Sequence, residues 1–254
     1  MVLTVDVGNT NIMLGGFEGN ELLFVARVAT DDKKTEDEYA GLMLSILNAY
    51  NVDKNSVCGA IVSSVVPQIT ATVKKAVKFI SNTEPLIVGP GIKTGIGIRC
   101  DDPASVGADL ISACVATHFI YGSPALIVDL GTATKMIVLD RKGSFAGVSI
   151  IPGVQTGLKA LAASAAQLPL VGLEAPSTVV GKNTVDCIKS GIIFGHASMV
   201  DGMIDRICNE VGDDLSVYAT GGLASAIIPY CKHKIKTDEH LVLKGLNILY
   251  KKNS

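Results

Sequence analysis

Two short acidic turns in this sequence have the residue types needed to bind a phosphate chain. Each follows an apolar segment, and they read Asp6-Val7-Gly8-Asn9-Thr10-Asn11 and Asp129-Leu130-Gly131-Thr132-Ala133-Thr134. Glycine lets the backbone approach a ligand closely, and Asn and Thr side chains donate hydrogen bonds to phosphate oxygens. Because an aspartate repels phosphate, Asp6 would act through a cation, normally magnesium with its waters. The repetition favours phosphate binding over a plain Asp-Gly hairpin turn, and we expect the two turns to hold one polyphosphate and its metal.

A third motif, Thr220-Gly221-Gly222, follows the apolar segment Leu215–Ala219. A strand that ends in Gly-Gly before a helix can bring its backbone against an adenosine. Gly-Gly turns are common, so this motif alone is weak. After the two acidic turns, it completes the pattern of an ATP site in which Gly221 and Gly222 contact the nucleotide.

The same segments predict how these motifs are positioned. The first half reads as three strands in hairpins, then a helix over Thr35–Asn51, a strand over Gly59–Ser64, a helix over Pro67–Ile80 and a strand over Leu86–Val88. Asp102-Pro103 is typical of a helix start, and this helix would run to about Tyr121 with Asp109 about two turns inside it.

The second half repeats the order. A second hairpin set is expected over Ala125–Ile151, helix and loop over Pro152–Pro176, a long helix over Thr184–Val211, a strand over Leu215–Ala219 and a last helical pair. The fold class is therefore α/β, with two similar lobes at residues 1–120 and 121–254, each a mixed sheet flanked by helices.

Bulk properties exclude several functions. A net charge of −2, 5% aromatic residues and no tryptophan argue against a nucleic-acid partner. No signal peptide and no apolar run of membrane-spanning length is evident, so we expect a cytoplasmic protein with no membrane partner. The six cysteines contain no Cys-x-x-Cys pair and the four histidines have no metal-ligand spacing, so we interpret them as ordinary structural residues.

The three motifs, in this order, resemble those of the sugar kinase, heat-shock protein 70 and actin superfamily. Three more stretches make the whole chain similar to the type III pantothenate kinases: Gly95–Asp109, which ends Pro103-Ala104-Ser105-Val106-Gly107-Ala108-Asp109; Ile151-Pro152-Gly153-Val154; and Gly181-Lys182-Asn183-Thr184. The resemblance implies an actin-like ATPase (ribonuclease H-like) fold. It also implies that Mg-ATP phosphorylates pantothenate to 4′-phosphopantothenate, the first step of coenzyme A biosynthesis.

The resemblance also implies roles for individual residues. Asp109 would be the general base, Asp129 would bind a monovalent cation (potassium or ammonium), and Thr132 would be a second ATP contact. Thr184 and Cys100 would contact the substrate. The phosphate loop would consist of Asp6, Val7, Gly8, Asn9, Thr10, Asn11, Ile12 and Met13, and the substrate segment of Gly107, Ala108, Asp109 and Leu110. A carboxylate such as Asp109 can orient and deprotonate a primary alcohol.

The family works as a homodimer in which the neighbouring subunit closes the pantothenate pocket. The apolar helical stretch Ile188 to Ile207 could form such an interface, and could equally be the core of a lobe.

Four positions depart from the usual pattern. Leu110 replaces an arginine, Cys100 a tyrosine, Asp102 an asparagine and Lys135 a threonine. The arginine would be a natural partner for the pantothenate carboxylate, and its loss should cost about 1.5–3 kcal/mol of binding or more.

Three of these changes fall in the acceptor segment, while both phosphate turns are otherwise intact. Arg99 or Lys93 could supply the lost charge, or could simply lie on the surface. An open alternative is a divergent homologue that binds ATP but acts on another alcohol or has a non-catalytic regulatory role. A phosphatase of the same superfamily is less favoured.

Overall fold

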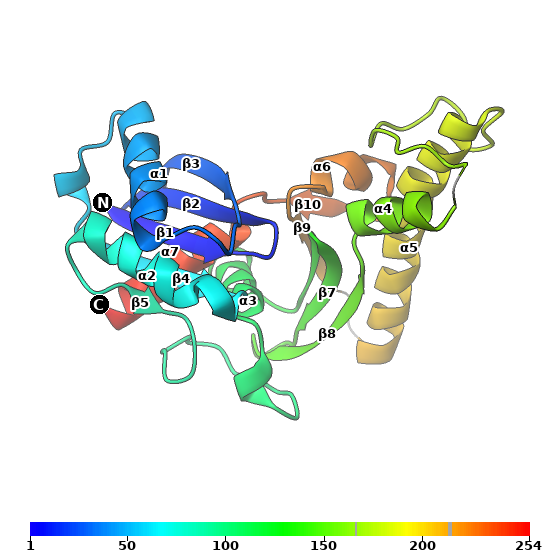
Figure 1. Cartoon of the computed structure of the whole chain (residues 1–254). Helices are drawn as coiled ribbons and strands as arrows, with labels where there is room; N and C mark the ends of the chain where they lie inside the picture. Colours follow the sequence, from blue (N-terminus) through cyan, green and yellow to red (C-terminus); the bar gives the residue numbers. More distant parts are fainter. Residues whose placement is uncertain (166, 213–214) are drawn as a thin grey trace. The chain divides into compact units, whose positions relative to one another are not determined.

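The computed structural model describes residues 1–165, 167–212 and 215–254. These residues divide into two units, and each contains one five-stranded mixed sheet (Figure 1). The first unit comprises Met1–Gly97, Asp101–Tyr121 and Leu241–Ser254, and the second comprises Ile98–Cys100 and Gly122–His240. Within the described ranges, none of the helices combines the length and apolarity required to cross a bilayer.

The sheet of the first unit has the strand order β3-β2-β1-β4-β5. Strand β2 is antiparallel to β1 and β3, whereas β4 runs parallel to β1 and β5 parallel to β4. The strands are β1 (Val2–Val7), β2 (Asn11–Glu18), β3 (Glu21–Ala29), β4 (Gly59–Ser64) and β5 (Leu86–Ile87). The helices are α1 (Glu36–Ala49), α2 (Pro67–Ser81), α3 (Ala108–Tyr121) and α7 (Leu241–Asn253), with 3-10 turns at Lys54–Ser56 and Pro103–Ser105.

Successive side chains of β1 point to opposite faces of this sheet. Leu3, Val5 and Val7 are buried in one cluster with residues of α1 and α2. Thr4 points to the other face, where its hydroxyl donates to the Gly15 carbonyl at 3.1 Å, close to Leu243 of α7. Leu3, Thr4 and Val5 are all buried although they point alternately to the two faces, as expected for a strand with a helix layer on each side.

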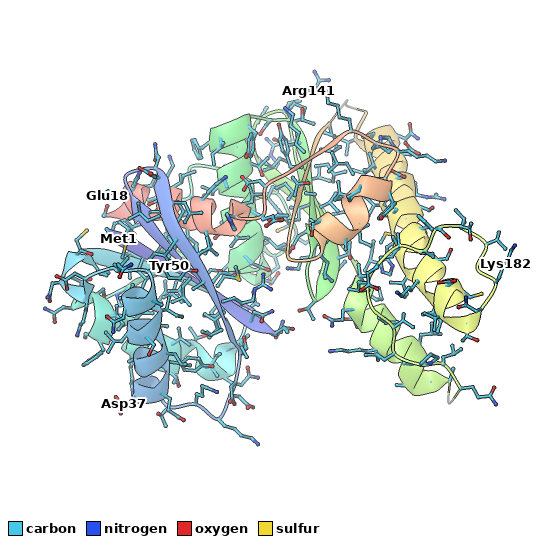
Figure 2. The ribbon with its side chains drawn as sticks, turned by 90° about the horizontal axis from the view of Figure 1, so that it is seen from above. Met1, Glu18, Asp37, Tyr50, Arg141 and Lys182 are labelled. Carbon is cyan, nitrogen blue, oxygen red and sulfur yellow. The ribbon has the colours of Figure 1, made fainter. Side chains whose placement is uncertain are left out.

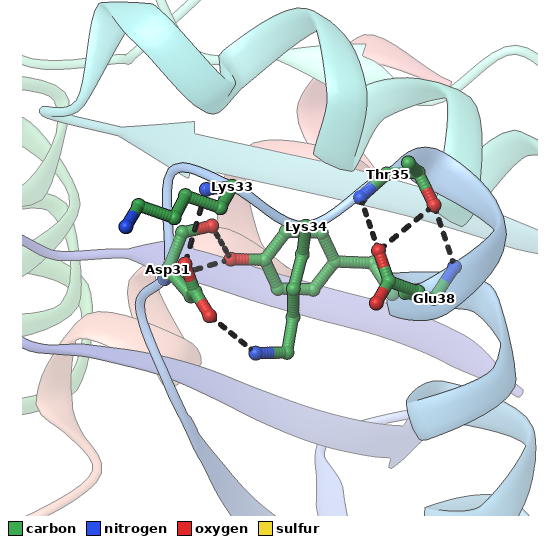
Figure 3. A network of polar contacts seen from close by, with 6 residues as sticks. Asp31, Lys33, Lys34, Thr35 and Glu38 are labelled. Atoms are coloured by element: carbon green, nitrogen blue, oxygen red, sulfur yellow. Dashed lines mark hydrogen bonds and ion pairs between the residues drawn. The ribbon is translucent and has the colours of Figure 1, made fainter.

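Helix α1 begins where a local polar network fixes the chain after β3 (Figure 3). Thr35 caps the helix through a capping box with Glu38, at the start of the helix predicted over Thr35–Asn51. Upstream, the Lys34 ammonium lies 2.6 Å from the Asp31 carboxylate, and the Tyr39 hydroxyl donates to the Asp31 carbonyl at 2.8 Å. At the other end of α1, Tyr50 (labelled in Figure 2) donates its hydroxyl to the carbonyl of Val25 in β3 at 2.8 Å.

The second unit repeats the strand order as β10-β9-β6-β7-β8. Its strands are β6 (Ala125–Leu130), β7 (Ala133–Leu139), β8 (Phe145–Pro152), β9 (Ser216–Thr220) and β10 (Ile235–Thr237). Its helices are α4 (Val154–Ser164), α5 (Thr184–Val211) and α6 (Ala224–Ile227), followed by a 3-10 turn at Ile228–Tyr230. Strands β1 to β5 correspond in order and direction to β6 to β10, so the predicted duplication is confirmed.

Helix α5 has the bounds that the sequence predicts, Thr184–Val211. Its apolar side chains, including Ile188, Ile193 and Ile204, are buried with residues of β6 and β9. The stretch Ile188 to Ile207 therefore forms the core of the second unit, which is the second of the two interpretations that the sequence left open.

Two expectations about the first unit need correction. Helix α3 begins at Ala108, because the chain makes a 3-10 turn over Pro103–Ser105 and is extended at Val106 (φ −68°, ψ 122°). Asp109 therefore lies in the first turn of its helix and not two turns inside it. In addition, Leu241–Ser254 packs in the first unit, which a single division of the chain after residue 120 does not describe.

Candidate active site

The first acidic turn connects β1 and β2, and Thr30 hydrogen-bonds to its backbone. The Gly8 N–H donates to the Asn11 carbonyl at 3.0 Å, and the Thr30 hydroxyl donates to the Gly8 carbonyl at 2.6 Å. The Thr30 N–H donates to the Thr10 carbonyl at 3.0 Å. Asn9 and Thr10 are exposed. These bonds fix the backbone of the turn while its tip faces solvent, where it can meet a ligand.

Asp6 lies beside Ser63 at the carboxyl edge of two parallel strands. The register of β1 and β4 pairs Asp6 with Ser63 and Val7 with Ser64, and the Val65 N–H donates to the Val7 carbonyl at 3.0 Å. The Ser63 side chain is fully buried, and among the described residues its hydroxyl has no hydrogen-bond partner. Ligands of open α/β sheets bind outside the carboxyl ends of the strands, so this edge is where chemistry is expected.

Asp109 belongs to the same edge of the first sheet. A Cβ added to Gly107 would lie 2.6 Å from Asp109 Oδ1 and 3.7 Å from a methyl of Val65, the residue that follows β4. The Leu110 N–H donates to Asp109 Oδ1 at 2.8 Å, which orients the carboxylate. Asp109 is partly exposed, and its place in the first turn of α3 lets the helix dipole stabilise its negative charge. Gly107 and Asp109 therefore lie close to the residue that follows β4, and β4 is the strand that pairs with β1, which carries Asp6. That Asp6 and Asp109 serve one site stays a prediction.

Leu110 itself turns inward. Its side chain is only 8% exposed and belongs to the apolar core. If Leu110 contacts a substrate, it does so through its backbone. Its side chain provides no positive charge at this position.

The second acidic turn is backed by the N-terminus of α4. Gly153 caps this helix, and a Cβ there would overlap the Thr132 carbonyl oxygen and lie 2.7 Å from the Gly131 carbonyl oxygen. The Thr156 hydroxyl donates to the Thr132 carbonyl at 2.8 Å. A helix N-terminus attracts anions, so the stretch Ile151–Val154 places a favourable site for an anion next to the second acidic turn.

The Gly-Gly motif packs directly on the second turn. Strands β6 and β9 are parallel with Asp129 opposite Thr220, and the Leu223 N–H donates to the Leu130 carbonyl at 3.1 Å. Gly221 has φ +92°, and a Cβ there would lie 2.7 Å from Asp129 Oδ1. Only glycine suits both the backbone angle and this close approach. The structure therefore places two of the three expected ATP motifs side by side in the second unit.

Asp129 is engaged by a cation of the chain itself. Lys135 Nζ lies 3.0 Å from Asp129 Oδ2, and the two side chains are 21% and 16% exposed respectively. The residues are directly opposite each other in the β6–β7 register. The monovalent cation that the resemblance implies at Asp129 therefore does not fit the residues present, because an ammonium group already lies against this carboxylate.

The other predicted acceptor residues lie as follows. Cys100 is partly exposed and belongs to the second unit, where the neighbouring Arg99 makes an ion pair with Asp140 at 3.2 Å. Lys93 is exposed, and its N–H donates to the Asn253 side chain at 2.9 Å. Thr184 is exposed at the first position of α5, directly after its cap.

In the part of the chain that the structure describes, no three His, Cys, Asp or Glu residues gather in a way that could hold a metal ion. Magnesium in nucleotide sites is typically held by one or two carboxylates together with phosphate oxygens and water. Asp6, at the strand edge beside the first turn, could provide the one carboxylate that such a magnesium site needs.

Comparison with known proteins identifies the family. The family model described as type III pantothenate kinase matches residues 2–206. The type III pantothenate kinase of Moorella thermoacetica is 42% identical over 254 residues, covering 100% of both chains.

Solved structures agree on the fold. Component A of (R)-2-hydroxyglutaryl-CoA dehydratase from Acidaminococcus fermentans has a TM-score of 0.57 at 18% identity, covering 98% of this chain and 96% of that one. The activator of 2-hydroxyisocaproyl-CoA dehydratase from Clostridium difficile, solved with bound ADPNP, has a TM-score of 0.56 at 12% identity, covering 98% and 93%. The fold is that of the actin-like ATPases and sugar kinases, with two similar halves. By its family match and its full-length relative, the chain belongs to the type III pantothenate kinase family.

Proposed function

We propose that this protein transfers the γ-phosphoryl group of ATP to the 4′-hydroxyl of pantothenate. The product, 4′-phosphopantothenate, is the first intermediate on the route to coenzyme A. The observation that carries this proposal, beyond family membership, is the position of Asp109. Its carboxylate is oriented by the Leu110 N–H at the strand edge that also bears Asp6 and the first phosphate turn.

Each site residue then has a defined task. Asp109 accepts the proton of the acceptor hydroxyl as the oxygen attacks phosphorus, and ADP leaves with the bond electrons. The turns Asp6–Asn11 and Gly131–Thr132 contact the triphosphate, together with Ile12 and Met13 at the start of β2. Gly221 and Gly222 contact the adenosine, and Asp6 holds magnesium through water. When bound, magnesium neutralises charge on the β- and γ-phosphates.

The residues expected to contact the acceptor favour a second candidate substrate. The Leu110 side chain is buried and apolar, and the Arg99 guanidinium is paired with Asp140. Neither supplies the cation expected for a carboxylate. An alcohol related to pantothenate but lacking its carboxylate is therefore the alternative acceptor, and a nucleotide-binding regulator without turnover is the more distant one.

The test is an acceptor panel with purified protein and Mg-ATP. Pantothenate, panthenol (the alcohol in place of the acid) and a blank without acceptor are compared by ADP release and by the product mass. We expect phosphorylated pantothenate, with a preference over panthenol smaller than the roughly 10- to 150-fold that a charge-assisted contact of about 1.5–3 kcal/mol would provide. Transfer to panthenol alone would support the alternative, and no transfer to any alcohol would contradict both.

Two further parts of the proposal rest on family membership. We propose a homodimer in which the partner subunit closes the pantothenate pocket, and a cytoplasmic location, which suits six free cysteines. Because the buried apolar side chains of α5 pack within their own unit, the proposed dimer would form through surface outside them. Light scattering at micromolar concentration measures the mass directly, and a mass of 26.4 kDa would contradict the dimer.

A further inference from the structure

We infer that Lys135 supplies, from within the chain, the positive charge that the resemblance assigns to a monovalent cation at Asp129. The enzyme would then work without potassium or ammonium. This inference deepens the proposed function and rests on it only where activity is measured. It replaces the expectation of a bound cation, which the residues around Asp129 do not fit.

The ion pair is the first support. Lys135 Nζ lies 3.0 Å from Asp129 Oδ2, and both side chains are largely shielded from solvent. Two residues directly opposite on antiparallel strands are near enough for their charged groups to meet without distortion. Partial burial makes a charge pair of this kind less sensitive to salt than a surface pair. The ammonium is thus held against the carboxylate by the fold itself.

The second oxygen of Asp129 is closed in from the other side. A Cβ at Gly221 would lie 2.7 Å from Asp129 Oδ1, and one at Gly131 would lie 3.5 Å from the same atom. Backbone of two turns therefore borders Oδ1, while the ammonium borders Oδ2. A second cation at this carboxylate would have to sit beside the first and be repelled by it.

The repeat of the fold shows that hairpin architecture does not demand this pair. In the first hairpin the residue opposite Asp6 is Met13, whereas in the second the residue opposite Asp129 is Lys135. The same register position is neutral in one turn and cationic in the other. The cation is a property of the turn that carries Thr132, where a triphosphate is proposed to bind.

A tethered ammonium also differs from an ion thermodynamically. A bound ion stabilises its site by a free energy that grows with the logarithm of its concentration relative to its dissociation constant, and it adds almost nothing when the ion is scarce. Lys135 is present at every salt composition. The inference therefore predicts indifference to the type of monovalent cation in the wild type, and a dependence that appears when the ammonium is removed but room is left.

The test compares wild type with Lys135→Thr, Lys135→Met and Lys135→Arg. Melting temperatures and ADP affinities are measured in potassium chloride and in tetramethylammonium chloride at equal ionic strength. For wild type, the melting temperature and the ADP affinity should each be the same in the two salts, and the same should hold for Lys135→Arg. Lys135→Thr, which opens space beside Asp129, should be stabilised by potassium and bind ADP at least fivefold more tightly in it. Lys135→Met fills the space without charge and should not respond.

Kinase rates in the two salts form the last comparison, and should differ less than twofold for the wild type. A several-fold stimulation of the wild type by potassium, in melting, binding or rate, overturns the inference, and so does a Lys135→Thr protein that folds but ignores potassium. If Lys135→Thr does not fold, the responses of wild type and Lys135→Arg decide. Failure of pantothenate phosphorylation would leave the melting and ADP results intact, so it is distinguishable from failure of this inference.

Discussion

Gly153 packs against the second acidic turn so closely that its position leaves no room for a side chain. A Cβ there would overlap the Thr132 carbonyl oxygen, which is backbone and cannot rotate away. We predict that Gly153→Ala separates α4 from the turn, lowers the free energy of unfolding by about 1–3 kcal/mol and weakens ADP binding. Calorimetric titration with ADP and urea unfolding measure both effects.

Gly157→Ala is the matched control in the same helix. A Cβ at this position would meet nothing closer than a ring carbon of His196 at 3.9 Å. Since alanine is favoured over glycine inside a helix by about 0.8–1 kcal/mol, this variant should be slightly more stable and bind ADP normally. Equal behaviour of the two variants would refute the role assigned to Gly153.

Thr30 makes the corresponding prediction for the first turn. Its hydroxyl donates to the Gly8 carbonyl at 2.6 Å. Thr30→Val keeps the shape but removes the donor, so stability should fall by about 0.5–1.5 kcal/mol and ADP affinity should fall several-fold. Thr30→Ser keeps the hydroxyl and should stay close to wild type in both measurements. An unchanged ADP affinity in Thr30→Val would show that the turn does not need this support.

At this scale the sequence predicted the turns but not what holds them. Asp6, Gly8 and Gly131 stand out because their residue types are unusual in combination and local in sequence. Thr30 and Thr156 reach their turns from 22 and 24 residues away, so no local pattern links them. The ion pair of Lys135 with Asp129 could have been foreseen, because it follows from the hairpin register that the repeat already implies.

At the scale of elements, two lysines of α2 form ion pairs with one carboxylate in the loop that leads to β5. The Glu84 oxygens lie 2.6 Å from Lys74 Nζ and 2.8 Å from Lys78 Nζ. Hydrogen bonds from Lys74 and then Lys78 lower the pKa of Glu84 to about 2 from 4.5. Because the folded pKa is the lower one, this contribution to stability is complete above pH 4.5 and is lost as the pH falls toward 2.

We therefore predict that Glu84→Gln lowers the melting temperature at pH 6 and that its difference from wild type shrinks to nothing near pH 2. Both lysines reach a solvent-exposed carboxylate, so the effect should be small and weakened by salt. Glu18→Gln, at the exposed end of β2, is the control and should leave the melting curve unchanged. A Glu84→Gln difference that grows on acidification would contradict the assignment.

The contact of α3 with α7 depends on one glycine. A Cβ at Gly245 would overlap the Ser112 carbonyl oxygen and lie 2.6 Å from the Ser112 carbonyl carbon. Gly245→Ala should push the helices apart and lower the free energy of unfolding in urea by about 1–3 kcal/mol. Because α3 carries Asp109, the rate of phosphoryl transfer should fall as well.

Gly191→Ala is the control for this change, since Gly191 is an exposed position of α5 with nothing within 4 Å of an added Cβ. It should be neutral or slightly stabilising. A Gly245→Ala protein as stable as wild type would mean that the two helices tolerate a wider separation.

Most elements could be predicted because their signals are local. The capping box at Thr35 and Glu38, Pro67 at the first position of α2 and the 28-residue periodic stretch of α5 each define an element without tertiary information. Strand β10 has no comparable signal in the sequence, because its three residues, Ile235–Thr237, are partly or fully exposed and follow a basic segment. The local signal also predicts too early a start for α3, because Asp102 and Pro103 begin a separate 3-10 turn that ends at Ser105.

At the scale of the whole molecule, the repeat of strand order in two units is the organising feature. This repeat could be predicted because each strand has an apolar pattern that is recognisable in the sequence without tertiary information. The return of Leu241–Ser254 to the first unit could not, because it depends on contacts such as that of Gly245 with Ser112, more than 130 residues apart along the chain. The family model matches residues 2–206 and the Moorella thermoacetica relative covers the full length, so the repeat belongs to a known kinase architecture.

The most direct test of the central claim follows the γ-phosphorus of ATP by ³¹P NMR in the presence of magnesium and pantothenate. We predict that the γ-signal is replaced by one phosphomonoester signal, in step with ADP, and that Asp109→Asn slows this by about 10²–10⁴-fold. Release of inorganic phosphate at the same rate with and without pantothenate, or an Asp109→Asn protein as fast as wild type, would contradict the account.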